Sequence, residues 1–217
     1  MSVTTASLGD HSSSMRIPLC VPRWDERRAL DAGARWDPGR EMFWWPAQQP
    51  TDTVWVWLPR KWQRNPALWP EMLPSTAWES NLRNAVEPHQ WDALRRHAYA
   101  AAGWRCEICG DRPNAPLEAH EAWSWDDTWC VQKLEGLLSL CPPCHKAHHV
   151  GLARRLSLWK DVQQKFFEVN GWDEAQLKEA LAAATKQANE RSRFGWTLDL
   201  SWLTQSNYYM VYHFARK

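Results

Sequence analysis

Two Cys-x-x-Cys pairs constrain the fold of this chain more than any other feature of its sequence. Cys106 and Cys109 form the first pair, and Cys141 and Cys144 form the second. Two such pairs supply the four thiolates of a tetrahedral zinc site. The stretch between Cys109 and Cys141 is longer than in a simple zinc ribbon, so it predicts a sizeable insert between two zinc knuckles. The sequence therefore predicts a structural zinc ion in its second half.

The composition around these cysteines is that of a globular protein. The 217 residues are 44% hydrophobic, which is too apolar for a disordered chain. Residues 1–15 lack the apolar core of a secretory signal, and no later stretch approaches the roughly 20 apolar residues of a membrane span. We therefore expect a cytoplasmic protein without membrane association. Disulfides are disfavoured in that compartment, so Cys20 and Cys130 are expected to be small buried apolar residues.

Charge and aromatic content leave the class of partner open. The 26 Lys and Arg residues nearly balance the 25 Asp and Glu residues, so any contact with nucleic acid must use a local patch. The 18 tryptophans have two interpretations. They fill cores and seams between domains, or some are exposed and stack on bases.

The first part of the chain predicts a small α+β accessory domain at residues 16–62, after a flexible tail at residues 1–15. Gly33 is a natural end for a helix, and Asp37-Pro38-Gly39-Arg40 is a turn signal. Residues 53–58 alternate with the period of a strand. The expected elements are a strand at 17–22, a helix at 25–32, strands at 35–36 and 42–45, and a strand at 53–58.

A Pro-rich linker is expected at residues 63–75, before a larger domain at residues 76–217. Helical periodicity predicts three helices in that domain, at residues 88–103, about 156–170 and 173–191. We expect these helices to wrap the zinc-binding core.

Three histidines near the cysteine pairs predict a second metal site. His120 lies in a strand expected at residues 117–121, and His145 directly follows the last zinc cysteine and opens a helix. His149 is four residues after His145, so both imidazoles share one face of that helix. Three rings around one point would bind a second divalent ion, Mg²⁺, Mn²⁺, Ni²⁺ or Zn²⁺. The neighbouring His148 is either a solvated helix residue or a replacement for His149.

These cysteines and histidines resemble the HNH endonucleases of the ββα-metal, or His-Me finger, class. The resemblance rests on Cys106-x-x-Cys109-Gly110, residues 117–121, Leu140-Cys141-x-x-Cys144-His145 and His149. A wider set of residues resembles a bacterial group of HNH-endonuclease-like proteins over about residues 70–203. This set comprises Trp78-x-x-Asn81-Leu82-Arg83, Trp91-Asp92, His120-Glu121-x-Trp123, Gln132-x-Leu134, His149-Val150-Gly151-Leu152-Ala153, Arg191-Ser192 and Trp196-x-Leu198-Asp199-Leu200.

The resemblance implies a β-hairpin and a helix around a catalytic ion, with His120 as the strand ligand and His145 and His149 as the helix ligands. Glu121 stands where the family has its general-base histidine, and Gly136 stands where it has the asparagine that orients this base. His120 and Glu121 are therefore the expected catalytic residues, with Glu121 as the base. In the alternative, Glu121 caps a neighbouring backbone segment or pairs with an arginine.

The N-terminal block resembles, over residues 17–62, a small domain of unknown function found in DNA-processing proteins of mobile elements. The resemblance rests on Ala32-Gly33-Ala34-Arg35-Trp36-Asp37-Pro38 and Phe43-Trp44-Trp45-Pro46. It implies an accessory role, in which the Arg and Trp residues either meet nucleic acid or form a compact aromatic core.

The expected architecture is α+β, with a small aromatic-rich N-terminal domain followed by a zinc-stapled ββα-metal core that helices wrap. The expected function is that of a metal-dependent HNH-type endonuclease that hydrolyses phosphodiester bonds of DNA. The alternative is a catalytically inactive zinc scaffold that binds nucleic acid or a protein partner. A basic stripe after the metal helix either holds phosphates or is a solvated face, and it comprises Arg154, Arg155, Lys160 and Lys165.

Overall fold

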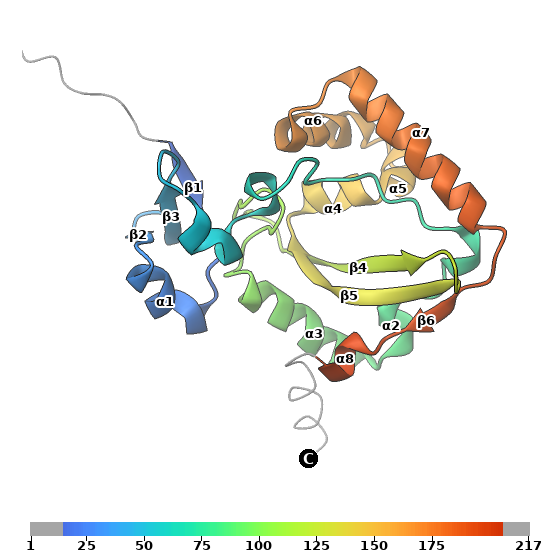
Figure 1. Ribbon diagram of the computed structural model, residues 1–217, viewed down its shortest axis with the longest axis horizontal. Helices are drawn as coiled ribbons and strands as arrows, with labels where there is room; N and C mark the ends of the chain where they lie inside the picture. The colour runs from blue at the N-terminus through green and yellow to red at the C-terminus, as the bar shows by residue number, and fades with distance from the viewer. Residues whose placement is uncertain (1–14, 206–217) are drawn as a thin grey trace, which may run out of the picture.

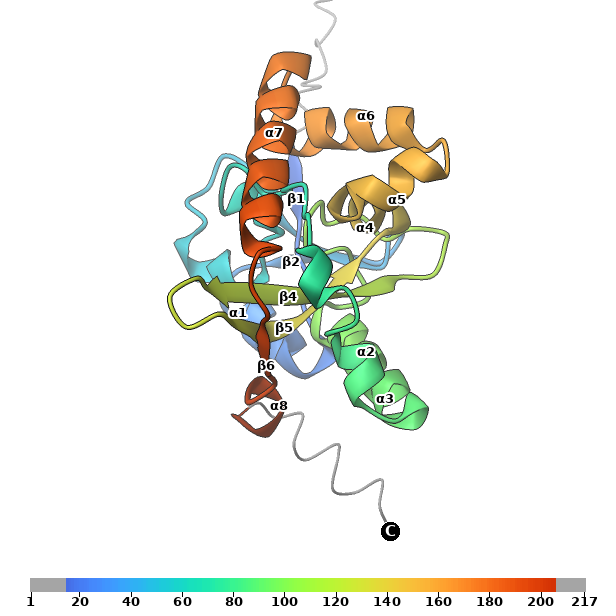
Figure 2. The ribbon, with the colours of Figure 1, turned by 90° about the vertical axis from the view of Figure 1, so that its right-hand side faces the viewer.

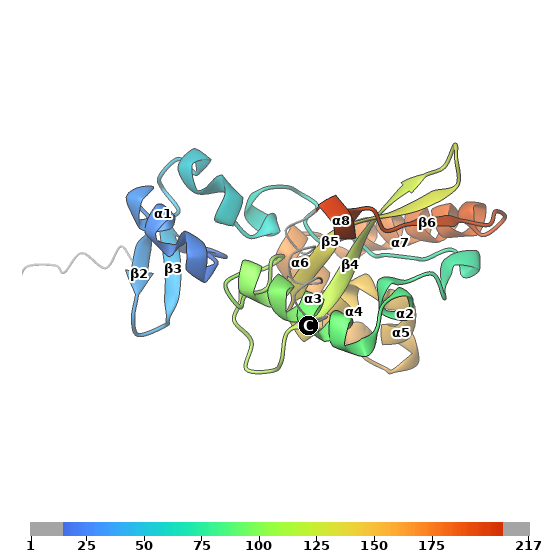
Figure 3. The ribbon, with the colours of Figure 1, turned by 90° about the horizontal axis from the view of Figure 1, so that it is seen from below.

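The computed structural model describes residues 15–205, so the tail expected at residues 1–15 lies almost wholly outside the described part of the chain. Two three-stranded sheets and a set of helices make an α+β fold, as the sequence predicts. Figure 3 shows an elongated molecule, with a small N-terminal unit at one end and a larger unit around a long β-hairpin at the other. Within the described residues, no helix is long and apolar enough to cross a membrane.

The N-terminal unit is an antiparallel sheet packed against short helices. Its strands are β1 (Arg16–Pro18), β2 (Arg35–Asp37) and β3 (Met42–Pro46). Strand β3 lies in the centre of the sheet. A 3-10 turn, η1 (Arg23–Asp25), leads into α1 (Glu26–Asp31), and Gly33 follows with a φ of +94°, which glycine adopts without strain. The helix and hairpin predicted here are confirmed.

The strand predicted for residues 53–58 is wrong. The segment forms a 3-10 helix, η2 (Asp52–Trp57), in which Val54 and Trp57 are buried while Trp55 and Val56 are exposed. A 3-10 helix brings residues i and i+3 onto one face, which suits this spacing of buried side chains. A strand would have placed Val54 and Val56 on the same face, and only Val54 is buried.

The larger unit is built around an antiparallel hairpin of β4 (Glu118–Asp126) and β5 (Val131–Leu140), to which β6 (Thr197–Asp199) adds a parallel strand. Its helices are α2 (Leu82–Ala85), α3 (Pro88–Ala101), α4 (Pro142–His148), α5 (Val150–Arg155), α6 (Trp159–Asn170), α7 (Glu174–Arg191) and α8 (Trp202–Gln205). Two 3-10 turns, η3 (Arg60–Trp62) and η4 (Ser75–Ala77), flank the Pro-rich segment. Helices α3, α6 and α7 confirm the three helices predicted from periodicity.

The hairpin separates two hydrophobic cores. Figure 1 shows α4 to α7 above the hairpin and α2, α3 and α8 below it, and Figure 2 shows the same division from the side. Leu138 and Leu140 pack in the upper core, whereas Leu134 and Leu137 pack in the lower one. Successive residues of a strand point to opposite faces, so the two faces of β4 meet different environments.

Part of the Pro-rich segment is packed into the upper core rather than solvated. Ala67 and Leu68 are buried there, and their N–H groups both donate to Oδ1 of Asn170 at 3.0 Å. The Asn170 amide in turn donates to the Leu68 carbonyl at 2.7 Å. One buried side chain at the end of α6 therefore satisfies three backbone groups of a segment that has no regular structure of its own.

The N-terminal unit packs directly on the first cysteine knuckle. Arg60 N–H donates to Glu107 O at 2.7 Å, and Lys61 N–H donates to Ile108 O at 3.1 Å. Gly110 has a φ of +81°, and a Cβ there would lie 2.7 Å from Pro59 Cγ. Only glycine permits this approach.

The two cysteines outside the pairs differ in burial. Cys20 is buried beside the first knuckle, as expected, and its Sγ contacts Cys106 O at 3.8 Å. Cys130 is only half-buried, so the same expectation is wrong for this residue. It precedes β5 with a φ of +50°, at the turn of the hairpin, where the turn keeps it from the cores.

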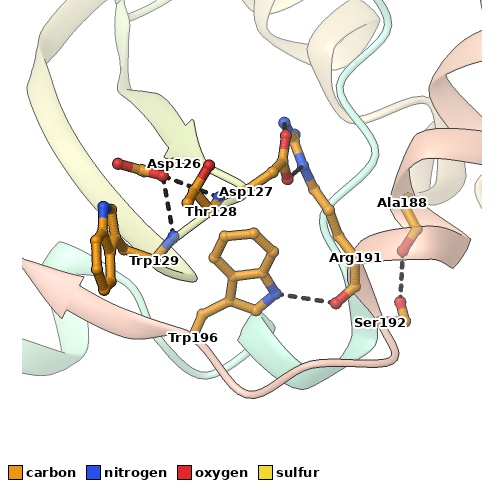
Figure 4. A network of polar contacts seen from close by, with 8 residues as sticks. All are labelled: Asp126, Asp127, Thr128, Trp129, Ala188, Arg191, Ser192 and Trp196. Carbon is orange, nitrogen blue, oxygen red and sulfur yellow. Dashed lines mark hydrogen bonds and ion pairs between the residues drawn. The ribbon is translucent and has the colours of Figure 1, made fainter.

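Arg191 joins the tip of the hairpin to the end of α7. Its guanidinium donates to both Asp127 carboxylate oxygens, at 2.7 and 2.9 Å, and lies 5.1 Å from the ring centroid of Trp125. The Trp196 indole donates to Arg191 O at 3.0 Å (Figure 4). The hydrogen bonds from Arg191 lower the pKa of the Asp127 carboxyl. The pair thus fixes the turn of β4–β5 against the chain that enters β6.

We expect Arg191→Ala to lower the free energy of unfolding by about 1–2 kcal/mol, because the ion pair is lost together with the contacts of the guanidinium with the rings of Trp125 and Trp196, at 5.1 and 5.9 Å. Asp127→Ala should cost less than about 1 kcal/mol, since its carboxylate is 60% exposed and the ion pair is screened by water. Urea denaturation of the zinc-saturated variants would measure both values. If Asp127→Ala lowered the free energy of unfolding more than Arg191→Ala does, the contacts of Arg191 with the indole rings would not be the main source of its effect.

Candidate metal centres

The four paired cysteines form one buried cluster. Their sulfur atoms all lie within 4.8 Å of one another, and Cys109 Sγ is 3.7 Å from Cys141 Sγ. Zinc–sulfur distances of about 2.3 Å in a tetrahedron separate the sulfurs by about 3.8 Å. The first pair lies on the knuckle that ends at Gly110, and the second lies at the start of α4, with Cys141 as its N-cap residue. The cluster is consistent with the structural zinc site predicted from the sequence.

The charge balance of this cluster favours a bound cation. Contact with the other three thiols, first of all Cys106, raises the pKa of Cys144, and burial raises it further. Four buried thiolates within 4.8 Å of one another would repel strongly without a positive charge beside them. Lys165 supplies part of that charge: burial acts to lower its pKa, but the charges of Cys109 and the neighbouring thiols raise it overall.

This position also removes Lys165 from the predicted basic stripe. Its side chain is 11% exposed and lies 3.7 Å from Asp111 Oδ2 and 3.5 Å from Glu168 Oε2. Lys165 therefore belongs to the surroundings of the cysteine cluster and not to a surface that faces a partner.

The three predicted histidines converge on one point. His120 comes from β4, His145 from α4 and His149 from the residue at which α4 ends, and their ligand nitrogens lie within 4.8 Å of one another. Nε2 of His145 is 3.1 Å from Nε2 of His149. The three rings are mutually edge-on, with interplanar angles of 70° to 80°. Ligand nitrogens this close can reach one ion, so the convergence expected from the sequence is confirmed.

The histidine cluster is suited to a cation at neutral pH. Burial, followed by the nearby His120, lowers the pKa of His149 to about 3, and the same two causes lower the pKa of His145. Both rings are therefore neutral at pH 7 and carry a free lone pair. Ligands to a metal ion must be in this form. The arrangement could bind a divalent ion in addition to zinc at the cysteines.

Helix α4 couples the two centres. Cys144 and His145 are adjacent, so the same turn of helix presents a sulfur to one centre and an imidazole to the other. Glu118 adds a carboxylate to the histidine centre by contacting Nδ1 of His145, which leaves Nε2 of that ring for an ion. Sequence reasoning missed Glu118. Its position two residues before His120, on the same face of a strand, is the signal that would have found it.

Glu121 lies on the other side of the hairpin. Its Oε1 accepts a hydrogen bond from Leu82 N–H at 3.0 Å, at the start of α2 in the lower core. Burial raises the pKa of this carboxyl, although the hydrogen bond from Leu82 lowers it in part. Glu121 points away from the histidine centre because adjacent residues of β4 point to opposite faces of the hairpin, and His120 faces α4. The geometry fits the alternative in which Glu121 caps a neighbouring backbone segment.

Gly136 adds no side chain to the histidine centre. It pairs with Ala122 at a β-bulge, and a Cβ there would lie 3.8 Å from the indole of Trp202. The position that carries asparagine in the family pattern is therefore occupied by backbone alone.

The expectation that His148 is a solvated helix residue is wrong. Its Nε2 atom is buried without a hydrogen-bond partner, and its ring stacks on His120 with centroids 4.3 Å apart. Burial lowers the pKa of His148 well below its ordinary value. The two rings are only 25° from parallel, and His148 is grouped with Glu71 and His120 rather than with His145 and His149. His148 therefore does not replace His149 in the cluster.

Two grooves open beside the histidines, and each is lined by arginine together with one glutamate, Glu71 or Glu118. A groove of about 440 Å³ contains His149, Arg155 and the exposed Trp78. A second groove, of about 430 Å³, contains His145 and His149, and its basic residues are Arg83, Arg95 and Lys146, none of which was predicted from the sequence to contact phosphate. Of the predicted stripe, only Arg155 shares a groove with the histidines.

The other two exposed members of the stripe lie elsewhere. Arg154 lies over the ring of Trp159 at 4.6 Å, in a separate groove that α5, α6 and α7 line, and Lys160 is exposed on α6. Basic residues that are close in sequence therefore lie on separate surfaces of the fold.

The hairpin, the following helix and the three histidines beside a four-cysteine cluster are consistent with an HNH-like site. Comparison of the chain with protein families, curated proteins and solved structures gave no match. The likeness to that class therefore rests on the residues and geometry of this chain alone.

Proposed function

We propose that this protein is a metal-dependent endonuclease of the HNH type that hydrolyses phosphodiester bonds of DNA. The observation that carries the proposal is the convergence of His120, His145 and His149 beside two grooves that each contain arginine. Neutral imidazoles suit a divalent transition metal, and arginines suit phosphate. An ion so placed would also lower the pKa of a bound water and so supply the nucleophile that hydrolysis of a phosphodiester needs.

Each group has a distinct part in this proposal. A divalent ion at the histidines would polarise the scissile phosphate and stabilise the charge that develops on the leaving oxygen. Arg155 and Arg83, one in each groove, would bind the flanking phosphates. Trp78 is 67% exposed in the groove of Arg155 and offers a face on which an unpaired base can stack.

The alternative is a zinc scaffold of the same fold that binds nucleic acid or a protein partner without hydrolysis. It is favoured by Glu121 and Gly136, since neither residue presents a general base to the histidine centre. A scaffold keeps the grooves and the zinc cluster but needs no ion at the histidines.

Cleavage should appear when zinc-loaded protein is given plasmid and single-stranded DNA with Mg²⁺, Mn²⁺, Ni²⁺ or Zn²⁺ in separate reactions, and it should disappear without the second ion. Glu121→Gln is the matched control. We expect it to cleave like the wild type, because glutamine accepts the same hydrogen bond from Leu82 N–H. A loss of about a hundredfold or more would instead establish Glu121 as the base. Binding of DNA without cleavage under any ion would favour the scaffold.

A further inference from the structure

Glu71 reaches the histidine cluster from the Pro-rich segment. This segment runs as a coil across the α4 side of the hairpin (Figure 1), and Glu71 N–H donates to His148 O at 3.1 Å. The carboxylate then lies against the cluster, with Oε2 2.8 Å from Nε2 of His120. The side chain of Glu71 is 23% exposed and that of His120 is 5% exposed, so water weakens this contact little.

Glu71, His120 and His148 form a second group whose candidate ligand atoms lie within 4.8 Å of one another. The stacked rings of His120 and His148 are a poor ion site, since lone pairs in nearly parallel planes do not meet at one point. Glu71 and His148 are better explained as partners that hold His120 in place. The carboxylate engages one ring nitrogen, and the stacked imidazole covers a face of the ring.

We propose that Glu71 is a positioning residue of the ion site and acts through His120. A neutral imidazole has one N–H and one lone pair. Glu71 accepts the Nε2–H of His120, so this ring presents Nδ1 to the ion. Glu118 engages Nδ1 of His145 in the same manner and leaves Nε2 for the ion. Carboxylates that hold metal-binding histidines in this way raise their basicity and fix their orientation.

The inference rests on the ion site of the proposed function but not on hydrolysis. It also assigns a role to the segment that joins the two units of the molecule. Ala67 and Leu68 are held by Asn170, so the segment is fixed a few residues before Glu71. The ion site is thereby completed by a part of the chain outside the hairpin and helix.

Titration of tag-free, zinc-loaded protein with Ni²⁺ by calorimetry tests the proposal. Glu71→Gln should bind Ni²⁺ about tenfold to a hundredfold more weakly than the wild type, the usual effect of losing such a carboxylate. Glu79→Gln is the control, because Glu79, like Glu71, precedes α2 in the chain but its side chain is exposed. This variant should bind Ni²⁺ like the wild type. Equal affinities for Glu71→Gln and the wild type would overturn the proposal.

A second measurement requires no substitution at Glu71. The sample is wild-type protein with zinc at the cysteines and no ion added for the histidine centre. Its ¹⁵N NMR spectrum should show His120 protonated at Nε2, with the signal assigned by its loss in His120→Gln. Protonation at Nδ1 would overturn the proposal even if Glu71→Gln folds poorly. Neither readout depends on cleavage: Ni²⁺ binding without hydrolysis would contradict only the nuclease, whereas wild type that binds no Ni²⁺ would remove the ion site itself.

Discussion

Cys144→Ser should abolish zinc binding and the cooperative unfolding transition of the larger unit. The four sulfurs are part of the upper core, packed with residues such as Ile108, Leu140 and Phe166. Structural zinc contributes an apparent binding free energy of about 10–16 kcal/mol in small zinc domains at pH 7, as much as the whole stability of an ordinary domain. Without the ion, the crowded thiols lose the cation that holds the knuckle against α4.

Zinc content and thermal unfolding followed by circular dichroism would measure this effect. Cys130→Ser is the matched control, because Cys130 lies outside the cluster and is only half-buried. It should keep its zinc and its transition. A zinc-free Cys144→Ser protein with a complete transition at the wild-type temperature would disprove the structural role.

Chelation of the zinc should also loosen the N-terminal unit. The backbone of Arg60 and Lys61 is hydrogen-bonded to Glu107 and Ile108, the two residues between the cysteines of the first pair. Hydrogen exchange should therefore show early loss of protection at residues 104–153 and, together with it, at residues 60 and 61.

His149→Ala should remove the ion from the histidine centre and lower cleavage by at least about a hundredfold, while the zinc and the fold are retained. Loss of one of three imidazoles leaves two ligands, and loss of even an outer carboxylate partner commonly costs tenfold to a hundredfold in affinity. The fold should survive, because His149 lies at the end of α4, between two open grooves.

His89→Ala provides the control for this variant, since His89 is exposed on α3 and is absent from all three groups of candidate metal ligands. His89→Ala should have the Ni²⁺ affinity of the wild type by calorimetry and the same rate of DNA cleavage. If His149→Ala bound Ni²⁺ and cleaved DNA like the wild type, the ion would have to be held elsewhere.

Local spacing predicted the parts of this protein that depend on neighbours in sequence. The i, i+4 spacing of His145 and His149 predicted a shared helix face, and helical periodicity predicted α3, α6 and α7. The same reasoning failed at η2, where alternating apolar residues suggested a strand. Residues 52–57 bury every third side chain because they pack against the small aromatic core, and a short apolar run does not reveal that contact.

The sequence by itself determined which residue types are the candidate ligands: two Cys-x-x-Cys pairs and three histidines. The short Cys-x-x-Cys spacing holds each pair of sulfurs together, and the helix pitch brings His145 and His149 onto one side. Only the tertiary structure decided which other side chains meet them. Alternation along β4 sends Glu118 and His120 toward α4 and Glu121 toward α2. A segment anchored by Asn170 brings Glu71 to His120 from far along the chain. Alternation is a local pattern, but the contact of Glu71 arises from packing between distant segments, and no local pattern in the sequence encodes it.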